Sequence, residues 1–171
     1  MITNKPPTRE GDRPFTHIPH PRDRIEALRK GRLASDDARV TLAMAILGPD
    51  YSVWDVVEHD IRMAREFGLV ASSHTRRRED SVTPGSYTRM AEAGLLGPDH
   101  NLVHGTSYDH DDLLQIVDSG ASLTSTVLVE LHHHIGDTQV AAYRAAGGLP
   151  SIGIDVEPFT SGQMFREMQA A

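Results

Sequence analysis

The chain has 171 residues, which suits a single domain, and 39% of them are hydrophobic, enough for a substantial core. Its formal net charge of −7 disfavours a general role in binding nucleic acid or anionic membranes. There is no cysteine, which excludes disulfides and thiolate zinc sites, and no apolar run reaches transmembrane length, so we expect a soluble cytoplasmic protein.

The first 35 residues are expected to form an arm and a short helix. Five prolines fall within residues 1–21, a composition that predicts no regular structure. Pro21 is well placed to open a helix over 22–31, which ends on a glycine. We therefore treat residues 1–35 as one unit and residues 36–171 as a second.

Beyond the arm, short apolar runs alternate with helix-like segments. Strands are predicted over 40–47, 69–74, 101–104, 121–125 and 149–155. Helices are predicted over 53–68 with Ser52 as N-cap, 87–93, 138–148 and 161–171, with a further helix capped by Asp109 or Asp111. Residues 126–137 are expected to be a loop or irregular.

This alternation is typical of parallel βαβ units and places the chain in the α/β class. A complete eight-unit TIM barrel needs about 250 residues, and this chain supplies about five units. We expect an open sheet or a partial TIM-barrel-like parallel sheet behind an irregular, Pro-rich N-terminal arm. Such a sheet exposes strand edges, so we also expect a homodimer that buries the open face, or a partner chain that completes the barrel.

Three of the predicted strands end on a residue of a type that commonly binds metal ions: His74, His104 and Asp155. In an α/β barrel the active-site groups lie at the C-terminal ends of the strands. Two imidazoles and a carboxylate suit Zn²⁺ or Fe²⁺. The alternatives are hydrogen-bonded strand-end histidines and an aspartate that caps a helix or pairs with an arginine.

Three stretches carry a resemblance to a known superfamily. They are the strand-end His74, the segment NLVHGTSYDHDDLLQIVDSG around His104, and the tail GGLPSIGIDVEPFTSGQMFREMQ. The tail holds a Gly-x-Asp motif, a small-residue loop and a Met-Phe-x-x-Met pattern, with Gly153, Asp155, Ser161, Met164, Phe165 and Met168. Residues 36–171 resemble barrel strands four to eight of the metal-dependent amidohydrolase superfamily, in particular its cytosine deaminase, guanine deaminase and triazine chlorohydrolase branch.

The resemblance implies a hydrolase that acts on C–N or C–Cl bonds of a small heterocycle or amide. His74 would be the strand-five metal ligand, and His104 either a ligand of a second metal or the group that hydrogen-bonds the water or substrate. Asp155 would touch the metal, zinc or iron, and take a proton from the attacking water. Glu130 resembles an acidic residue after strand seven and would contact substrate or form a structural ion pair.

The chain departs from that superfamily in two places. The strand-one His-x-His pair is missing, because His17 and His20 lie three residues apart in the arm. Arg76, Arg77 and Arg78 stand where many deaminases carry a glutamate, and form either a solvated loop face or a site for an anionic substrate. The alternative functions are therefore a non-catalytic half-barrel that serves as a binding or assembly module, and a metal-dependent lyase or isomerase.

Overall fold

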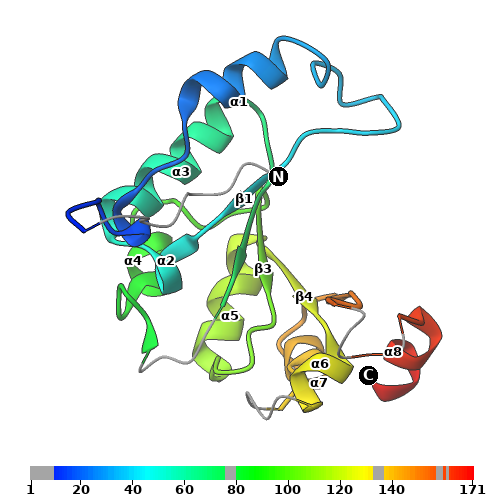
Figure 1. Ribbon diagram of the computed structural model, residues 1–171. Coiled ribbons are helices and arrows are strands. Elements are labelled where there is room, and N and C mark those ends of the chain that lie inside the picture. Colours follow the sequence, from blue (N-terminus) through cyan, green and yellow to red (C-terminus); the bar gives the residue numbers. More distant parts are fainter. Residues whose placement is uncertain (1–9, 76–79, 133–136, 157–159, 161) are drawn as a thin grey trace.

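The computed structural model describes residues 10–75, 80–132, 137–156, 160 and 162–171 (Figure 1). One parallel sheet has five strands in the order β1-β2-β3-β4-β5. The strands are Met44–Ile46 (β1), Ala71–His74 (β2), His100–Val103 (β3), Ser122–Ser125 (β4) and Ser151–Ile152 (β5). The helices are Phe15–His17 (η1, a 3-10 turn), Arg22–Arg29 (α1), Gly48–Tyr51 (α2), Trp54–Glu66 (α3), Ser86–Glu92 (α4), His110–Ser119 (α5), Val127–His132 (α6), Val140–Ala145 (α7) and Met164–Ala170 (α8).

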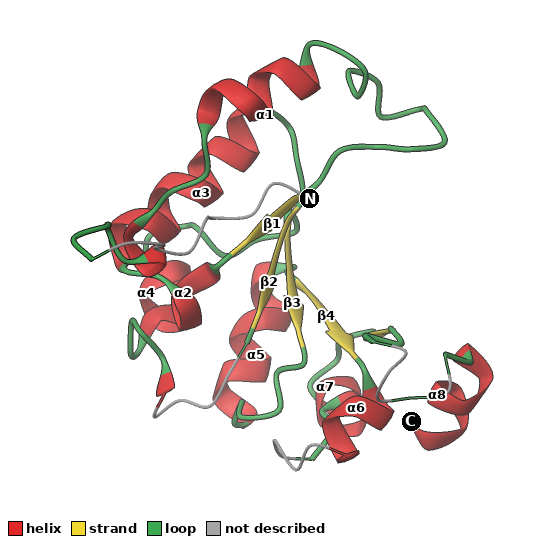
Figure 2. Cartoon of the chain, in the orientation of Figure 1, coloured by secondary structure: helices red, strands yellow, loops and turns green. Residues whose placement is uncertain are grey.

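Each strand pairs with the next strand along the chain, always in parallel, and helical segments connect them (Figure 2). This is the arrangement of successive βα units in part of a TIM-barrel-like sheet, so the expected α/β class and partial barrel are confirmed. Because the strands are parallel, their C-terminal ends all meet at one rim. In the part of the chain that the structure describes, no helix is long and apolar enough to cross a membrane.

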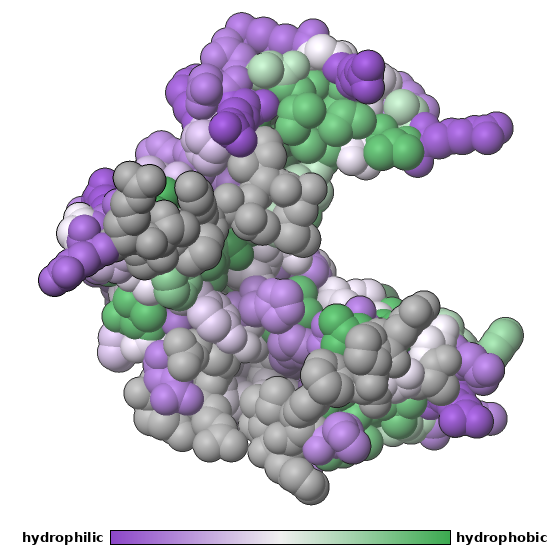
Figure 3. All heavy atoms as spheres, in the orientation of Figure 1, coloured by the Kyte–Doolittle hydropathy of each residue, from purple (hydrophilic) through white to green (hydrophobic). Residues whose placement is uncertain are grey.

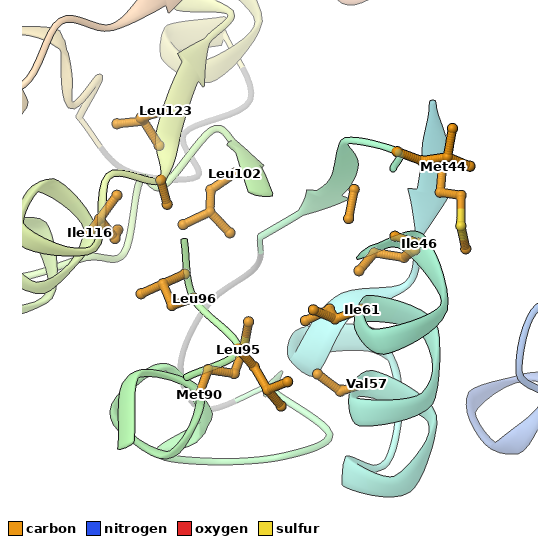
Figure 4. Close-up of a cluster of buried hydrophobic side chains, with 14 of the residues drawn as sticks. Met44, Ile46, Val57, Ile61, Met90, Leu95, Leu96, Leu102, Ile116 and Leu123 are labelled. Atoms are coloured by element: carbon orange, nitrogen blue, oxygen red, sulfur yellow. The ribbon is translucent and has the colours of Figure 1, made fainter. Parts of the chain in front are cut away.

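The hydrophobic core lies between the helices and one face of the sheet (Figure 4). The strands contribute alternate residues, as the two-residue repeat of a strand requires. Helix α3 adds Val57 and Ile61, both 1% exposed. The labelled core residues in Figure 4 are Met44, Ile46, Val57, Ile61, Met90, Leu95, Leu96, Leu102, Ile116 and Leu123.

The opposite face of the sheet carries small polar side chains joined by hydrogen bonds. Asn101 on β3 donates from Nδ2 to Ser72 Oγ on β2, at 3.0 Å. Its Oδ1 accepts from Ser122 Oγ at 3.0 Å and from Thr124 Oγ1 at 2.9 Å, both on β4. In the space-filling view a hollow opens between the α1 end of the molecule and the α6–α8 end (Figure 3).

The described part of the N-terminal arm packs along α3 and the edge strand β1. Its short turn η1 departs from the expected lack of regular structure. The backbone N–H of Val53 donates to Thr16 O at 3.0 Å. The imidazole of His20, which is 2% exposed, lies 2.8 Å from Ala45 O through Nε2. The backbone N–H of His20 donates to Asp60 Oδ1 at 2.9 Å, so the arm is tied to both elements.

Two predicted strands, those over residues 40–47 and 149–155, are less than half as long as expected. Strand β1 ends at Ile46 because Gly48 turns the chain with φ of +64° and begins α2; a Cβ on Gly48 would lie 2.7 Å from the Cβ of Ser73. Strand β5 covers only Ser151–Ile152, and Leu149, which was predicted to be in it, is 83% exposed.

Two other local predictions were wrong and one is confirmed. Residues 127–132 form helix α6 rather than a loop, because Val127 and Val129 face the interior at 0% and 4% exposure. Ser52 does not cap α3; its hydroxyl donates to Gly48 O at 2.7 Å and ends α2 instead. Asp109 does cap α5, in a reciprocal pair of hydrogen bonds with Asp112.

Candidate functional site

His104 is the centre of the candidate site. It directly follows β3, and its backbone N–H donates to Thr124 O at 2.8 Å, which continues the ladder to β4. Its φ is +78°, and Asp155 after β5 has φ of +67°. Among the described residues, these are the two non-glycine residues with positive φ. Such backbone costs about 1–3 kcal/mol and is common at functional sites.

Glu130 on α6 is fully buried and lies against the Nδ1 side of the His104 ring. Its Oε1 lies 3.2 Å from His104 Nδ1 and accepts from the backbone N–H of Thr126 at 2.7 Å. Its Oε2 accepts from Ser125 Oγ at 2.6 Å. Ser125 Oγ also lies 2.9 Å from Thr138 Oγ1. Both carboxylate oxygens are therefore engaged inside the protein.

The pKa of Glu130 lies below its usual value. Burial acts to raise it, but the hydrogen bonds from His104, Ser125 and the Thr126 backbone N–H outweigh that effect. Glu130 is therefore ionised at neutral pH and can only accept hydrogen bonds. Nδ1 of His104 lies 3.2 Å from this carboxylate and 3.0 Å from Thr126 Oγ1, so Nδ1 faces the buried groups and Nε2 lies on the other side of the ring.

Asp155 stands on that other side. Its Oδ2 lies 3.9 Å from His104 Nε2, too far for a hydrogen bond. Nε2 of His104 and a carboxylate oxygen of Asp155 therefore face each other across this gap. The side chain of Asp155 is 22% exposed, against 10% for His104, so the gap lies at the edge of the buried region.

His74 completes the group at the rim. It is the last residue of β2, and its ring centroid lies 5.1 Å from that of His104, with 48° between the ring planes. Partial burial of its imidazole lowers the pKa of His74, the neighbouring His104 lowers it further, and Asp155 opposes both. His74 is therefore neutral at pH 7 and able to bind a metal ion.

These residues have the donor chemistry that a divalent ion requires. The 3.9 Å between His104 Nε2 and Asp155 Oδ2 can be spanned by two metal bonds of about 2.0–2.2 Å each. Histidines that bind metal ions usually contact a carboxylate through their other ring nitrogen, as His104 contacts Glu130 here. Within the described ranges, however, no three His, Asp or Glu side chains converge tightly enough to hold an ion. The three expected ligands lie at one rim of the sheet but do not form a complete metal-binding site.

The structure places the other expected site residues as follows. Arg76 and Arg77 lie outside the described residues. Glu130 was expected to contact substrate or form a structural ion pair; its carboxylate is 0% exposed and lies 3.2 Å from His104 Nδ1. The sequence reasoning missed Ser125 and Thr126. Their signal was present: a Ser-Thr pair at the end of β4, with the glutamate four residues after the threonine.

Comparison with known proteins adds information on the fold. No family profile matches the sequence, and no curated protein does either. Among solved structures, a zinc-bound adenosine deaminase from Xanthomonas campestris is similar, with a TM-score of 0.74 and 22% identity. The match covers 86% of this chain and 35% of that one. This chain therefore shares its fold with part of that zinc-bound deaminase.

Two further structures extend the likeness. Aminofutalosine deaminase from Helicobacter pylori has a TM-score of 0.68 and 16% identity, over 87% of this chain and 44% of that one. Atrazine chlorohydrolase from Arthrobacter aurescens, complexed with zinc, has a TM-score of 0.65 and 16% identity, over 83% and 34%. The chain thus spans between a third and a half of the length of these structures.

Proposed function

We propose that this chain is a metal-dependent hydrolase of the amidohydrolase type, acting on a C–N or C–Cl bond of a small heterocycle or amide. The proposal rests on one observation. Buried Glu130 contacts Nδ1 of His104, and Nε2 of His104 lies 3.9 Å from Asp155 Oδ2. The likeness to deaminases and a chlorohydrolase supports the choice of reaction.

His74, His104 and Asp155 would hold the ion, for which zinc is the first choice and iron the second. When bound, a divalent ion at these ligands supplies Lewis-acid activation of water near neutral pH. Asp155 accepts the proton from the attacking water, since its carboxylate is partly exposed at the rim. His104 orients the water or substrate, and Glu130 fixes the orientation of the ring.

The expected substrate contacts from Arg76 and Arg77 belong to this proposal. Both follow β2 directly after His74 and Thr75, on the connection that begins at the rim. A guanidinium there would favour a substrate with negative charge or a carbonyl-rich ring. The second candidate function is a non-catalytic binding module. It is favoured because no three His, Asp or Glu side chains among the described residues converge into a complete metal site.

Hydrolysis assays distinguish the hydrolase from the non-catalytic binding module. A panel of amino- and chloro-substituted pyrimidines, purines and triazines, with cyclic amides, is incubated with zinc-loaded protein and the products are analysed. Asp155→Asn should abolish turnover, while Asp118→Asn, an exposed aspartate on α5, should not change it. Turnover at the same background level in all three proteins would leave only the binding module.

We also propose that the chain self-associates as a homodimer. The edge strands β1 and β5 each pair on one side only within the sheet. Large apolar side chains near the C-terminal end are exposed: Leu149 at 83%, Phe165 at 79% and Met168 at 59%. Light scattering should give twice the monomer mass at micromolar concentration; a monomer that dimerises only with a second, different chain would indicate a partner that completes the barrel.

A further inference from the structure

Thr75, the residue that follows β2, is hydrogen-bonded to the backbone on both sides of His104. Its backbone N–H donates to Val103 O at 3.1 Å, and its hydroxyl donates to the same carbonyl at 2.9 Å. The hydroxyl also accepts from the backbone N–H of Gly105 at 2.8 Å. Val103 O and the Gly105 N–H belong to the two peptide groups that flank the Cα atom of His104. One buried side chain, 6% exposed, therefore binds both of these peptide groups.

The backbone of His104 needs such support. Its φ of +78° lies in the left-handed region, where a non-glycine residue stays only when its surroundings hold it there. On the β4 side, the His104 N–H donates to Thr124 O at 2.8 Å, which holds the first of the two peptide groups only. On the β2 side, Thr75 binds the peptide groups before and after His104, so their relative orientation is fixed as well. That orientation is what φ and ψ of His104 describe.

The hydroxyl of Thr75 is essential to this arrangement. A hydroxyl group can donate one hydrogen bond and accept others, whereas a valine side chain of the same shape can do neither. Without the hydroxyl, the Gly105 N–H would lose its partner in a buried position, which is unfavourable. Val103 O would keep its bond from the backbone N–H of Thr75. The peptide group that follows His104 would therefore be the one set free, and the backbone could rotate about the bonds of His104 to find another partner.

The direction in which the His104 imidazole leaves the backbone depends on the same dihedral angles. In the structure, that direction places Nε2 3.9 Å from Asp155 Oδ2 and Nδ1 3.2 Å from Glu130 Oε1. Thr75 also directly follows His74, whose ring centroid lies 5.1 Å from that of His104. A rotation of the His104 backbone would change all three distances. Thr75 therefore links the two histidines of the candidate site through their backbones.

We propose that Thr75 is a positioning residue of the candidate site. Its hydroxyl holds the left-handed backbone of His104 and so keeps the imidazole aligned with His74 and Asp155. Thr75 acts through the backbone and needs no bond to metal or substrate. Its importance for metal binding rests on the proposed hydrolase function, whereas its effect on the His104 ring does not. The two effects are therefore measured separately.

NMR of the His104 ring in EDTA tests the positioning without metal. The carbon–proton cross-peak of this ring is identified by its loss in His104→Asn. The peak should move or broaden in Thr75→Val, and it should stay near the wild-type position in Thr75→Ser, which keeps the hydroxyl. Thr83→Val is the matched control and should leave the peak in place, because the Thr83 hydroxyl donates to Ser52 O, between α2 and α3, at 2.8 Å. A wild-type peak in Thr75→Val, or an equal displacement in Thr75→Ser, would overturn the proposal.

Zinc affinity, measured by competition with a chelator, is the second readout. Thr75→Val should bind zinc about tenfold or more weakly than the wild type, as is usual when a group that orients a metal ligand is removed, and Thr75→Ser and Thr83→Val should match the wild type. If Thr75→Val does not fold, Thr75→Ala takes its place, because it removes the hydroxyl without putting a methyl group against Val103 O. Wild-type affinity in a folded variant without the hydroxyl would refute the role of Thr75 in metal binding. A wild type that binds no zinc would refute the proposed function, and the ring NMR would then decide the role of Thr75.

Discussion

His100 is a buried histidine whose neutrality should make the fold sensitive to acid. It is 1% exposed on β3, and its Nε2 lies 2.9 Å from Ser73 Oγ. Burial lowers its pKa from 6.5 to about 4, partly offset by Asp99. Because the folded pKa is depressed, the unfolded chain binds this proton more readily. The stabilisation is complete above pH 6.5 and is lost as the pH falls toward 4.

The size of the effect follows from the two pKa values. The gap between 6.5 and about 4 corresponds to about 3 kcal/mol of unfolding free energy, since each unit is worth about 1.4 kcal/mol. Urea denaturation at a series of pH values between 7.5 and 4 measures it. His100→Gln removes the titrating group and keeps a side chain able to bond Ser73.

The wild type should lose about 3 kcal/mol more than His100→Gln between pH 7.5 and 4. Carboxylates that titrate near pH 4 affect both proteins and cancel in the difference. His110→Gln, at an exposed histidine on α5, should follow the wild type. Parallel pH profiles for the wild type and His100→Gln would refute the reasoning.

Two further substitutions test the support of the site. Glu130→Ala leaves buried hydrogen-bond donors unpaired and should lower the free energy of unfolding by about 3 kcal/mol or more, as measured by urea denaturation. The control Glu92→Ala, at an exposed glutamate, should lower it by less than about 0.5 kcal/mol. Gly105→Ala places a Cβ 2.9 Å from Leu123 and should cost about 1–3 kcal/mol more than Gly85→Ala, which has similar φ and open space. Equal thermal midpoints for the two glycine variants would contradict this packing argument.

The succession of strands could be predicted from the sequence, and so could the C-terminal ends of the first four to within one residue, but the last strand was expected to end at Asp155 and ends at Ile152. The buried runs ending near His74 and His104 are apolar, β-branched or small, and the turns after them begin with polar or glycine residues. Strand lengths were less predictable. A run such as residues 40–47 is as apolar at its exposed start as in its buried half, and only tertiary pairing decides which residues enter the sheet.

Helix α6 shows why a local pattern can mislead. The segment TVLVELHHH combines β-branched residues with histidines and has weak helical preference. Tertiary contacts decide its structure: Val127 and Val129 are buried, and Glu130 reaches back to the backbone N–H of Thr126 in the manner of a helix cap. Helix propensity, which is a local property of the sequence, does not include those contacts.

The pairing of His104 with Glu130 was likewise beyond sequence reasoning. The two residues are 26 positions apart, and their contact depends on the register of β3 and β4 and on the start of α6. The positive φ of His104 and Asp155 was also hidden, because neither is a glycine. The sequence did indicate that two imidazoles and a carboxylate lie at one rim, because the C-terminal ends of parallel strands meet at the same edge of the sheet.

The central claim is that this rim binds a divalent ion, and zinc retention tests it most directly. The protein is loaded with Zn²⁺, dialysed, and its zinc content measured by atomic absorption beside Asp155→Ala, His74→Ala and the control Asp118→Ala. We predict about one ion per chain in the wild type and the control, and none in the other two. A wild type that retains no zinc, or site variants that retain as much as the wild type, would contradict the account.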